Sequence, residues 1–230
     1  MYLPQPMLPG KLLRRYKRFF ADVELEDGSI ITAHTPNTGS MLQCAVAGHD
    51  VLVSPSDNPK RKLKYTLELI RVNGFWVDTN TQRANRLVEE GLRDGSILEL
   101  AGGRVRPEFR FGTSRIDFLV ERADERVLVE VKNVTLTDGQ RTALFPDAVT
   151  SRGQKHLREL AEARKEGYRA VIFFLVQRGE ADSFAPADAI DPEYGRLLRE
   201  VTGQGVEVLA YRTRVSVKEN RIGERVTVVL

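Results

Sequence analysis

The apolar residues change their spacing once along the chain, near residues 79–81, and this change limits the folds that the chain can adopt. Before it, short runs of alternating apolar and polar residues are separated by turn pairs such as Asp27-Gly28 and Asn73-Gly74, a pattern typical of β-hairpins. After it, apolar residues recur at helical spacing: Ala84, Leu87, Val88 and Leu92. We therefore predict an all-β domain over residues 1–80 and an α/β domain over residues 81–230.

The first domain contains short runs with strand character and no helical pattern. The predicted strands cover residues 19–25, 29–34, 50–53, 65–72 and 75–78. So many short strands in one small domain favour a barrel such as the OB-fold, a module that often binds oligonucleotides. Because many barrels of this kind bind no nucleic acid, the fold alone does not assign a function.

In the second domain, strands alternate with helices. After the first helix we predict strands at residues 97–100, 105–111, 114–121, 126–133, 169–176, 206–216 and 225–230. Ser151-Arg-Gly-Gln154 reads as a capping box that starts a second helix, which ends at Gly167, and a third helix covers residues 192–202. This succession predicts a mixed sheet flanked by helices.

The strands at 114–121 and 126–133 carry charged residues within apolar runs. A hairpin centred on Ala123-Asp124 would place Asp117 directly opposite Glu130. Because side chains alternate along a strand, the core face would carry Ile116, Phe118, Val120, Val127, Val129 and Val131. The other face would carry Leu119 and Leu128 in its middle and, at one end, Asp117, Glu130 and Lys132.

This charged end of the hairpin predicts a cation site. Like charges directly opposite one another destabilise a sheet, and buried charges are costly unless they are paired or bind a metal. Oxygen ligands suit Mg²⁺ or Mn²⁺ better than zinc, and Lys132 could orient an attacking water or offset phosphate charge. The alternative is an edge strand whose charges face solvent, and the residues alone leave both interpretations open.

Composition excludes several other classes. Of the 230 residues, 41% are hydrophobic and 29% charged, and the longest apolar run, residues 170–176, is far shorter than the ~20 residues of a membrane span. The first residues lack the order of a signal peptide, so we expect a cytoplasmic protein that contacts no membrane. Cys44 is the only cysteine, and His34, His49 and His156 lie far apart, which argues against a disulfide or a zinc site. Self-association into a homo-oligomer is left open.

Basic residues gather in two clusters of the first domain and near the charged hairpin. Basic clusters next to aromatic residues suit phosphate neutralisation and base stacking, and the amides at the start of the second helix could hold an anion. The candidate nucleic-acid contacts are Arg14, Arg15, Lys17, Arg18, Lys60, Arg61, Lys62, Lys64, Arg115, Arg152 and Lys155. Ordinary solvated surface charges are the alternative.

The order of an aspartate, a hairpin and Glu-x-Lys between two helices resembles the PD-(D/E)XK nuclease superfamily. More narrowly, segments spread over essentially the whole chain resemble the sugar fermentation stimulation protein family, SfsA. These segments are Pro36–Gly39, Asp78–Asn85, Ser114–Leu119, Val129–Leu136 and Phe145–Leu157. The resemblance implies an OB-like N-terminal domain, a nuclease-like C-terminal domain, and DNA binding linked to the regulation of sugar metabolism.

The resemblance also implies roles for individual residues. Asp117 and Glu130 would be ligands of Mg²⁺ or Mn²⁺, Lys132 would be the catalytic lysine, and a further acid would come from Glu108 or Glu89. The sequence departs from the superfamily's name because Ile116 precedes the aspartate. The letters Pro-Asp in Phe145-Pro-Asp147 follow the hairpin, so Asp147 is not the aspartate of the motif.

The leading hypothesis is a DNA-binding protein without sequence specificity, linked to regulation of sugar (maltose) metabolism and carrying a nuclease-type metal site. The alternative is an active Mg²⁺- or Mn²⁺-dependent DNA endonuclease or exonuclease, for which Asp117, Glu130 and Lys132 are all present. A third, less favoured hypothesis is an enzyme that acts on a small phosphorylated metabolite. Whether DNA is cleaved is left open.

Overall fold

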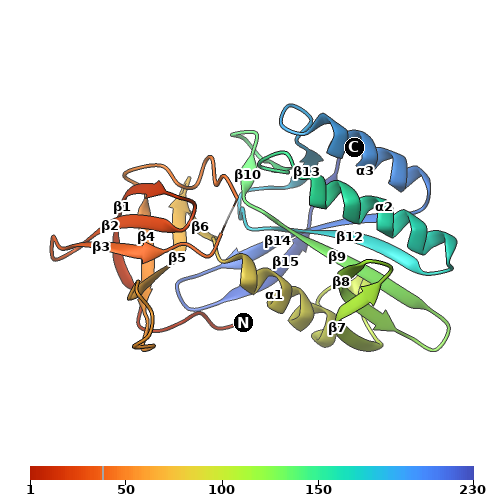
Figure 1. Ribbon diagram of the computed structural model, residues 1–230, viewed down its shortest axis with the longest axis horizontal. Helices are drawn as coiled ribbons and strands as arrows, with labels where there is room; N and C mark the ends of the chain where they lie inside the picture. Colours follow the sequence, from red (N-terminus) through yellow and green to blue (C-terminus); the bar gives the residue numbers. More distant parts are fainter. Residues whose placement is uncertain (38) are drawn as a thin grey trace.

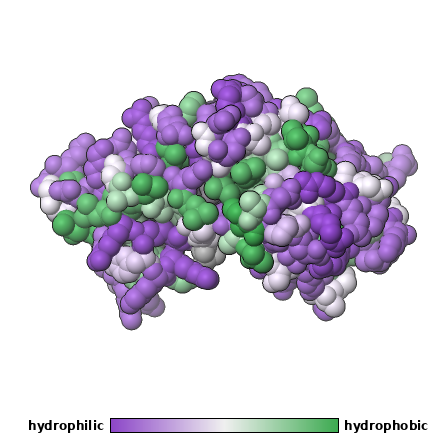
Figure 2. Space-filling model, turned by 90° about the horizontal axis from the view of Figure 1, so that it is seen from above, coloured by the Kyte–Doolittle hydropathy of each residue, from purple (hydrophilic) through white to green (hydrophobic). Residues whose placement is uncertain are grey.

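The computed structural model describes residues 1–37 and 39–230, and these form two lobes (Figure 1). The surface is mostly hydrophilic and is hollowed between the lobes (Figure 2). The chain starts on the second lobe, where the backbone N–H of Leu3 donates to the carbonyl of Lys218 over 2.9 Å and Tyr2 pairs with Glu219. The first residues therefore cross from the second lobe to the first.

The first lobe is the predicted OB-like barrel. Strands β1 to β5 close into a barrel through the pairing of β3 with β5, and β6 extends the sheet beyond β5. Their bounds are β1 Leu8–Tyr16, β2 Phe20–Leu25, β3 Ile30–His34, β4 Asp50–Pro55, β5 Tyr65–Val72 and β6 Phe75–Asp78. The sequence prediction missed β1, because its basic residues hide the alternation and its register with β2 shifts between Leu12 and Arg14.

The second lobe is the predicted mixed sheet, with strands in the order β15-β14-β12-β9-β8-β7. Its strands are β7 Arg104–Phe111, β8 Ser114–Glu121, β9 Arg126–Val134, β12 Arg169–Val176, β14 Glu207–Val215 and β15 Asn220–Arg225. Its helices are α1 Thr81–Asp94, α2 Ser151–Lys165 and α3 Pro192–Gly203. Within the described residues, none of these helices is long and apolar enough to cross a membrane.

Several predicted elements of this lobe need correction. Residues 98–100 form a 3₁₀ turn, η1 Leu98–Leu100, where a strand was predicted. Thr150 caps α2, because its hydroxyl accepts from the N–H of Gly153 over 3.1 Å, while Gln154 donates to Asp191 over 3.0 Å. The strand predicted at 225–230 is present only in part, as the last residue of β15 and the short strand β16 Thr227–Val228, while most of β15 precedes it and was not predicted. A small second sheet was not predicted, because its strands are very short: β10 Leu136–Thr137, β11 Thr142–Phe145, β13 Ser183–Pro186 and β16 Thr227–Val228.

Both faces of the central sheet are buried. Helix α1 covers one face, where its apolar stripe packs with Phe118, Val120, Val127, Val129 and Val131. Helices α2 and α3 cover the other face, where Leu119 and Leu128 are fully buried. Ile116 packs on this second face, which corrects the prediction that it shares a face with Phe118. The strict alternation is interrupted beside Asp117, which lies outside the regular pairing of β8 with β9.

A buried ion-pair network joins the two lobes. Arg83 on α1 donates two hydrogen bonds to Asp78, over 2.6 and 2.8 Å, and also contacts the carboxylate of Glu68 on β5. All three side chains are less than 10% exposed. Asn220 on β15 donates to Asp78 over 3.1 Å. One arginine therefore holds the barrel strands β5 and β6 against the first turn of α1.

We expect Arg83→Ala to lower the free energy of unfolding by about 3–5 kcal/mol, because it leaves two buried carboxylates without their cation. Arg93→Ala is the matched control on the same helix. Its ion pair with Glu89 is exposed, so the expected loss is below about 0.5 kcal/mol. Urea unfolding of both variants measures the difference, and equal losses would contradict the role assigned to Arg83.

Candidate functional site

The hairpin of β8 and β9 brings Asp117 and Glu130 to the same level of the sheet. The observed pairs run from Phe118 with Val129 to Glu121 with Arg126, which is the predicted register. Asp117 and Glu130 are the next residues in that register, just past the last regular pair. The hydrophobic pattern of the two strands sets this alignment, because a slip of one residue would move every side chain of a strand to the opposite face of the sheet.

Asp117 is held between β9 and α1. Its Oδ2 atom accepts from the backbone N–H of Val131 over 2.8 Å, and its Oδ1 atom accepts from Asn85 on α1 over 2.7 Å. Burial raises the pKa of Asp117 to about 6, and the negative charge of Glu130 adds to the effect. The two carboxylates therefore interact electrostatically.

Glu130 is only 2% exposed, and its two oxygens have different surroundings. Oε1 accepts from the ammonium of Lys132 over 2.6 Å and contacts Nδ1 of His156 on α2. Burial opposes ionisation of Glu130, but the hydrogen bond from His156 and the charge of Lys132 outweigh it and lower the pKa. Oε2 is buried and has no hydrogen-bond partner among the described residues.

His156 is the ring that orients Glu130. Arg152 donates to its Nε2 atom over 3.4 Å, and its Nδ1 atom faces Oε1 of Glu130. Lys132 lies 3.3 Å from the same Nδ1 atom. His156 thus keeps Oε1 occupied and leaves Oε2 as the free oxygen of the carboxylate.

The site can offer a cation oxygen atoms of two carboxylates, those of Asp117 and Glu130. A buried carboxylate oxygen without a partner is costly, and a hard divalent cation is a group that would satisfy it. Among residues 1–37 and 39–230, no cluster of three or more His, Cys, Asp or Glu side chains is arranged to hold a metal. A cation at this pair would therefore take its remaining ligands from other oxygen donors, such as water or a phosphate.

The structure does not bring Glu108 or Glu89 to this pair. Glu108 lies opposite Asp117 in the register of β7 with β8, but its backbone has a φ of 55° and its side chain is 64% exposed beside Arg115. Glu89 pairs with Arg93 over 2.7 Å. Asn85, one turn before Glu89 on α1, is the helix residue that reaches Asp117.

Two residues of the site were not assigned to it from the sequence. Asn85 lies at the border of the apolar stripe of α1, and His156 lies in the first turns of α2. Their position in the site depends on how the helices pack on the sheet. A polar residue at the edge of an apolar helical stripe was the only sign available in the sequence.

Some of the basic residues predicted to contact nucleic acid already bind other groups of the protein, and others are exposed to solvent. Arg15 is largely structural, since it donates to the carbonyls of Asn37, Gly39 and Ser40, and Arg14 pairs with Asp22 over 2.7 Å. Exposed basic residues remain on the turn after β1 and on the loop between β4 and β5: Lys17, Arg18, Lys60, Lys62 and Lys64. Arg61 donates to Thr66 over 3.0 Å. On the second lobe, Arg115, Arg152 and Lys155 are exposed on β8 and α2.

The Pro36–Gly39 segment, of which Thr38 lies outside the described residues, contacts the start of the α2 region. Asn37 forms the expected turn by accepting from the N–H of Gly39 over 2.8 Å. Asp147 accepts from the N–H of Met41 over 3.1 Å, and a side chain at Gly39 would lie within 2.8 Å of its carboxylate. The two segments therefore form a second junction between the lobes.

Comparisons with known proteins cover both lobes. Residues 82–219 match the model of the sugar fermentation stimulation protein RE domain, and residues 13–78 match the SfsA N-terminal OB domain. A sugar fermentation stimulation protein homolog from Syntrophotalea carbinolica is 65% identical over 230 residues, covering 100% of both chains. The homolog from Geobacter sulfurreducens is 57% identical over 231 residues, covering 100% of this chain and 99% of the relative.

A solved structure agrees with these matches. SfsA from Pyrococcus furiosus, determined in complex with Ca²⁺, superposes with a TM-score of 0.89 at 28% sequence identity. The match covers 100% of this chain and 98% of that one. The fold, the two domain matches and the high identity to full-length relatives agree, and the chain belongs to the sugar fermentation stimulation protein family.

Proposed function

We propose that the protein binds DNA without sequence specificity and hydrolyses its phosphodiester bonds at Asp117, Glu130 and Lys132 with the help of Mg²⁺ or Mn²⁺. The observation that carries the proposal is the Oε2 atom of Glu130, which is buried beside a second carboxylate and has no hydrogen-bond partner in the described part of the chain. A relative of the same fold was solved with Ca²⁺, a cation with the same preference for oxygen ligands.

Each residue of the site has a distinct role in this proposal. Asp117 and Glu130 would hold the cation, whose chemistry when bound is to activate water and to neutralise phosphate charge. The ammonium of Lys132, already 2.6 Å from Glu130, can donate to a water or phosphate oxygen placed beside that carboxylate. His156 and Asn85 keep the two carboxylates oriented. The exposed basic residues of the barrel would bind the DNA backbone.

A second candidate is a DNA-binding regulator of sugar metabolism that does not cleave DNA. Two groups already contact Oε1 of Glu130, which would also be compatible with a purely structural ion pair. The name shared by the relatives refers to sugar fermentation. Both candidates require DNA binding, and they differ in whether phosphodiester bonds are hydrolysed.

The first test is cleavage of plasmid and single-stranded DNA with Mg²⁺ or Mn²⁺. We expect Glu130→Gln and Lys132→Ala to lower the rate at least about 100-fold, since each removes a group that acts on the reacting water or phosphate. Arg196→Ala, an exposed change on α3, should leave the rate unchanged. If wild type and all variants share one background rate while still binding DNA, the regulator is the better description.

The second test uses the pKa of Asp117 in protein freed of metal with EDTA. Its pKa is about 6 in the folded chain, against 3.8 for an ordinary aspartate. Between these values the folded state keeps a proton that the unfolded state releases, so stability falls as pH rises. Asp117→Asn removes this cost, and its stability relative to wild type should increase over that range and then level off.

Urea unfolding at several pH values measures this difference. Addition of Mn²⁺ should stabilise wild type more than Asp117→Asn, because a ligand stabilises only the folded state that binds it. A difference between the two proteins that does not change with pH would refute the raised pKa of Asp117.

The third test concerns His156. We expect His156→Ala to weaken Mn²⁺ binding about 10–100-fold, the usual effect of removing a group that orients a metal ligand. His156→Gln keeps a hydrogen-bond donor and should lose less. Calorimetric titration with Mn²⁺ measures both affinities without any need for cleavage. Affinities equal to that of wild type would show that His156 does not orient Glu130 for a cation.

A further inference from the structure

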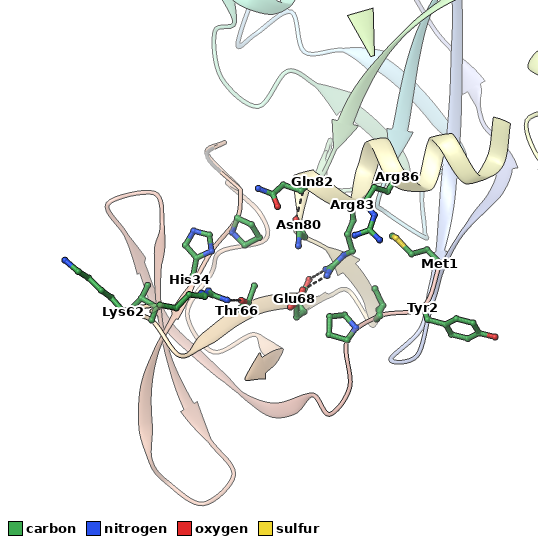
Figure 3. A pocket seen from close by; sticks show the side chains of 15 residues that line it. Met1, Tyr2, His34, Lys62, Thr66, Glu68, Asn80, Gln82, Arg83 and Arg86 are labelled. Atoms are coloured by element: carbon green, nitrogen blue, oxygen red, sulfur yellow. Dashed lines mark hydrogen bonds and ion pairs between the residues drawn. The ribbon is translucent and has the colours of Figure 1, made fainter. Parts of the chain in front are cut away.

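A groove lies between the two lobes, next to the first turns of α1. Its volume is about 780 Å³, and the barrel, α1 and the first residues of the chain each form one side. Figure 3 shows Arg86 and Gln82 on α1 and His34 and Thr66 on the barrel side, with Lys62 extending outward from the barrel. The pair of Arg83 with Glu68 forms its floor, so the relative position of the walls is fixed by a buried ion pair.

The groove is strongly cationic. Its lining contains Arg61, Lys62, Arg83 and Arg86 and one carboxylate, Glu68. Arg83 is shared between Glu68 and the buried carboxylate of Asp78, whereas Arg61, Lys62 and Arg86 take part in no ion pair in the described part of the chain. Three positive charges, two on the barrel and one on α1, therefore face one excess negative charge of this network, and the groove stays cationic.

A neighbouring groove is lined by a different balance of charges. It lies between α1 and β15 and has a volume of about 890 Å³. Its charged lining residues are Arg86, Arg214, Arg221, Glu90, Asp94, Glu219 and Glu224. Met1 also lines it, and its N-terminal ammonium pairs with Glu90 over 2.9 Å, so the positive and negative charges there balance. A polyanion would therefore be attracted more strongly to the interlobe groove than to this neighbour.

Helix α1 connects the groove to the candidate site. Arg86 lines the groove, and the preceding residue, Asn85, donates to Asp117. A strand that lay along the groove would therefore pass beside the helix turn that also positions Asp117. If that strand contacted Arg86 on α1 and also Arg61 and Lys62 on the barrel, it would touch both lobes at once.

The groove also offers an aromatic ring. His34 lines it and stacks on Phe19, with ring centroids 6.4 Å apart and an angle of 3° between the planes. Burial and the nearby charge of Arg61 lower the pKa of His34, which favours the uncharged ring. Aromatic rings next to cations bind single strands, because unpaired bases expose a face for stacking, whereas bases within a duplex are already stacked on one another.

We infer that the interlobe groove binds a single-stranded segment of the DNA and leads it toward Asp117. This rests on the proposed function and specifies its substrate: single-stranded DNA, or duplex DNA with a single-stranded extension. Arg86, Arg61 and Lys62 contact its phosphates, and His34 stacks on a base.

The test measures binding by fluorescence anisotropy in EDTA, so that no strand is cleaved. The probes are a labelled single-stranded oligonucleotide, its blunt duplex, and the same duplex with a single-stranded extension. Each is titrated at several salt concentrations with wild type, Arg86→Ala, His34→Ala and the control Arg221→Ala. Arg221 lies in the neighbouring groove, paired with Glu219 over 2.7 Å. Urea unfolding confirms that each variant is folded.

For the single strand, Arg86→Ala should reduce the steepness of log affinity against log salt by about 0.7, the contribution of one phosphate contact. His34→Ala should weaken binding about fivefold or more, as expected for loss of one stacked base. The variants should show the same changes with the extended duplex. All variants should bind the blunt duplex as wild type does, and Arg221→Ala should bind every probe as wild type does.

Equal effects of Arg86→Ala and Arg221→Ala, or an equal loss for the blunt duplex, would overturn the groove assignment and leave the proposed function standing. If wild type binds none of the three DNAs, the proposed function fails together with the groove.

Discussion

The structure depends on the buried pairing of Arg83 with Asp78 and Glu68. These residues come from the first turn of α1 and from the last two strands of the barrel lobe, so one guanidinium joins an OB-like barrel to a nuclease-like sheet. Burial of three charges is costly, and the full set of hydrogen bonds offsets that cost. The same pairing forms the floor of the interlobe groove. The junction of the Pro36–Gly39 segment with Asp147 is a second contact between the lobes, but only the Arg83 pairing also lines the groove.

In the candidate site, the two carboxylate oxygens of Glu130 have different surroundings. Lys132 and His156 satisfy one oxygen of this carboxylate, and the other is buried without a partner in the described residues. Asp117 lies next in register and shares its electrostatic environment. Without a cation, the two negative charges repel each other and one buried carboxylate oxygen lacks a hydrogen bond. Affinity for a divalent cation would then follow from the packing of β8, β9 and α2.

The sequence predicted the parts that depend on local pattern. Alternation and turn residues located most strands of the barrel, and the hairpin register of β8 with β9 was correct because the apolar residues on both strands allow one alignment. Prediction failed where pattern is weak. The charged strand β1 and the short strands β10, β11 and β13 are stabilised by pairing with distant strands, and nothing in their own residues indicates them. Ile116 was placed on the wrong face because the alternation is interrupted beside Asp117.

The sequence by itself determined the two-domain order, the family, and the alignment of Asp117 with Glu130, because each follows from residues close together or from a motif of fixed spacing. Only the tertiary structure decided which further groups surround that pair. Asn85 and His156 reach it because α1 and α2 pack on opposite faces of the sheet, while Glu108 and Glu89 point to other partners. The interlobe groove is likewise tertiary, since its walls come from segments that are separate in sequence. Side-chain direction across packed elements depends on long-range packing, which no local pattern encodes.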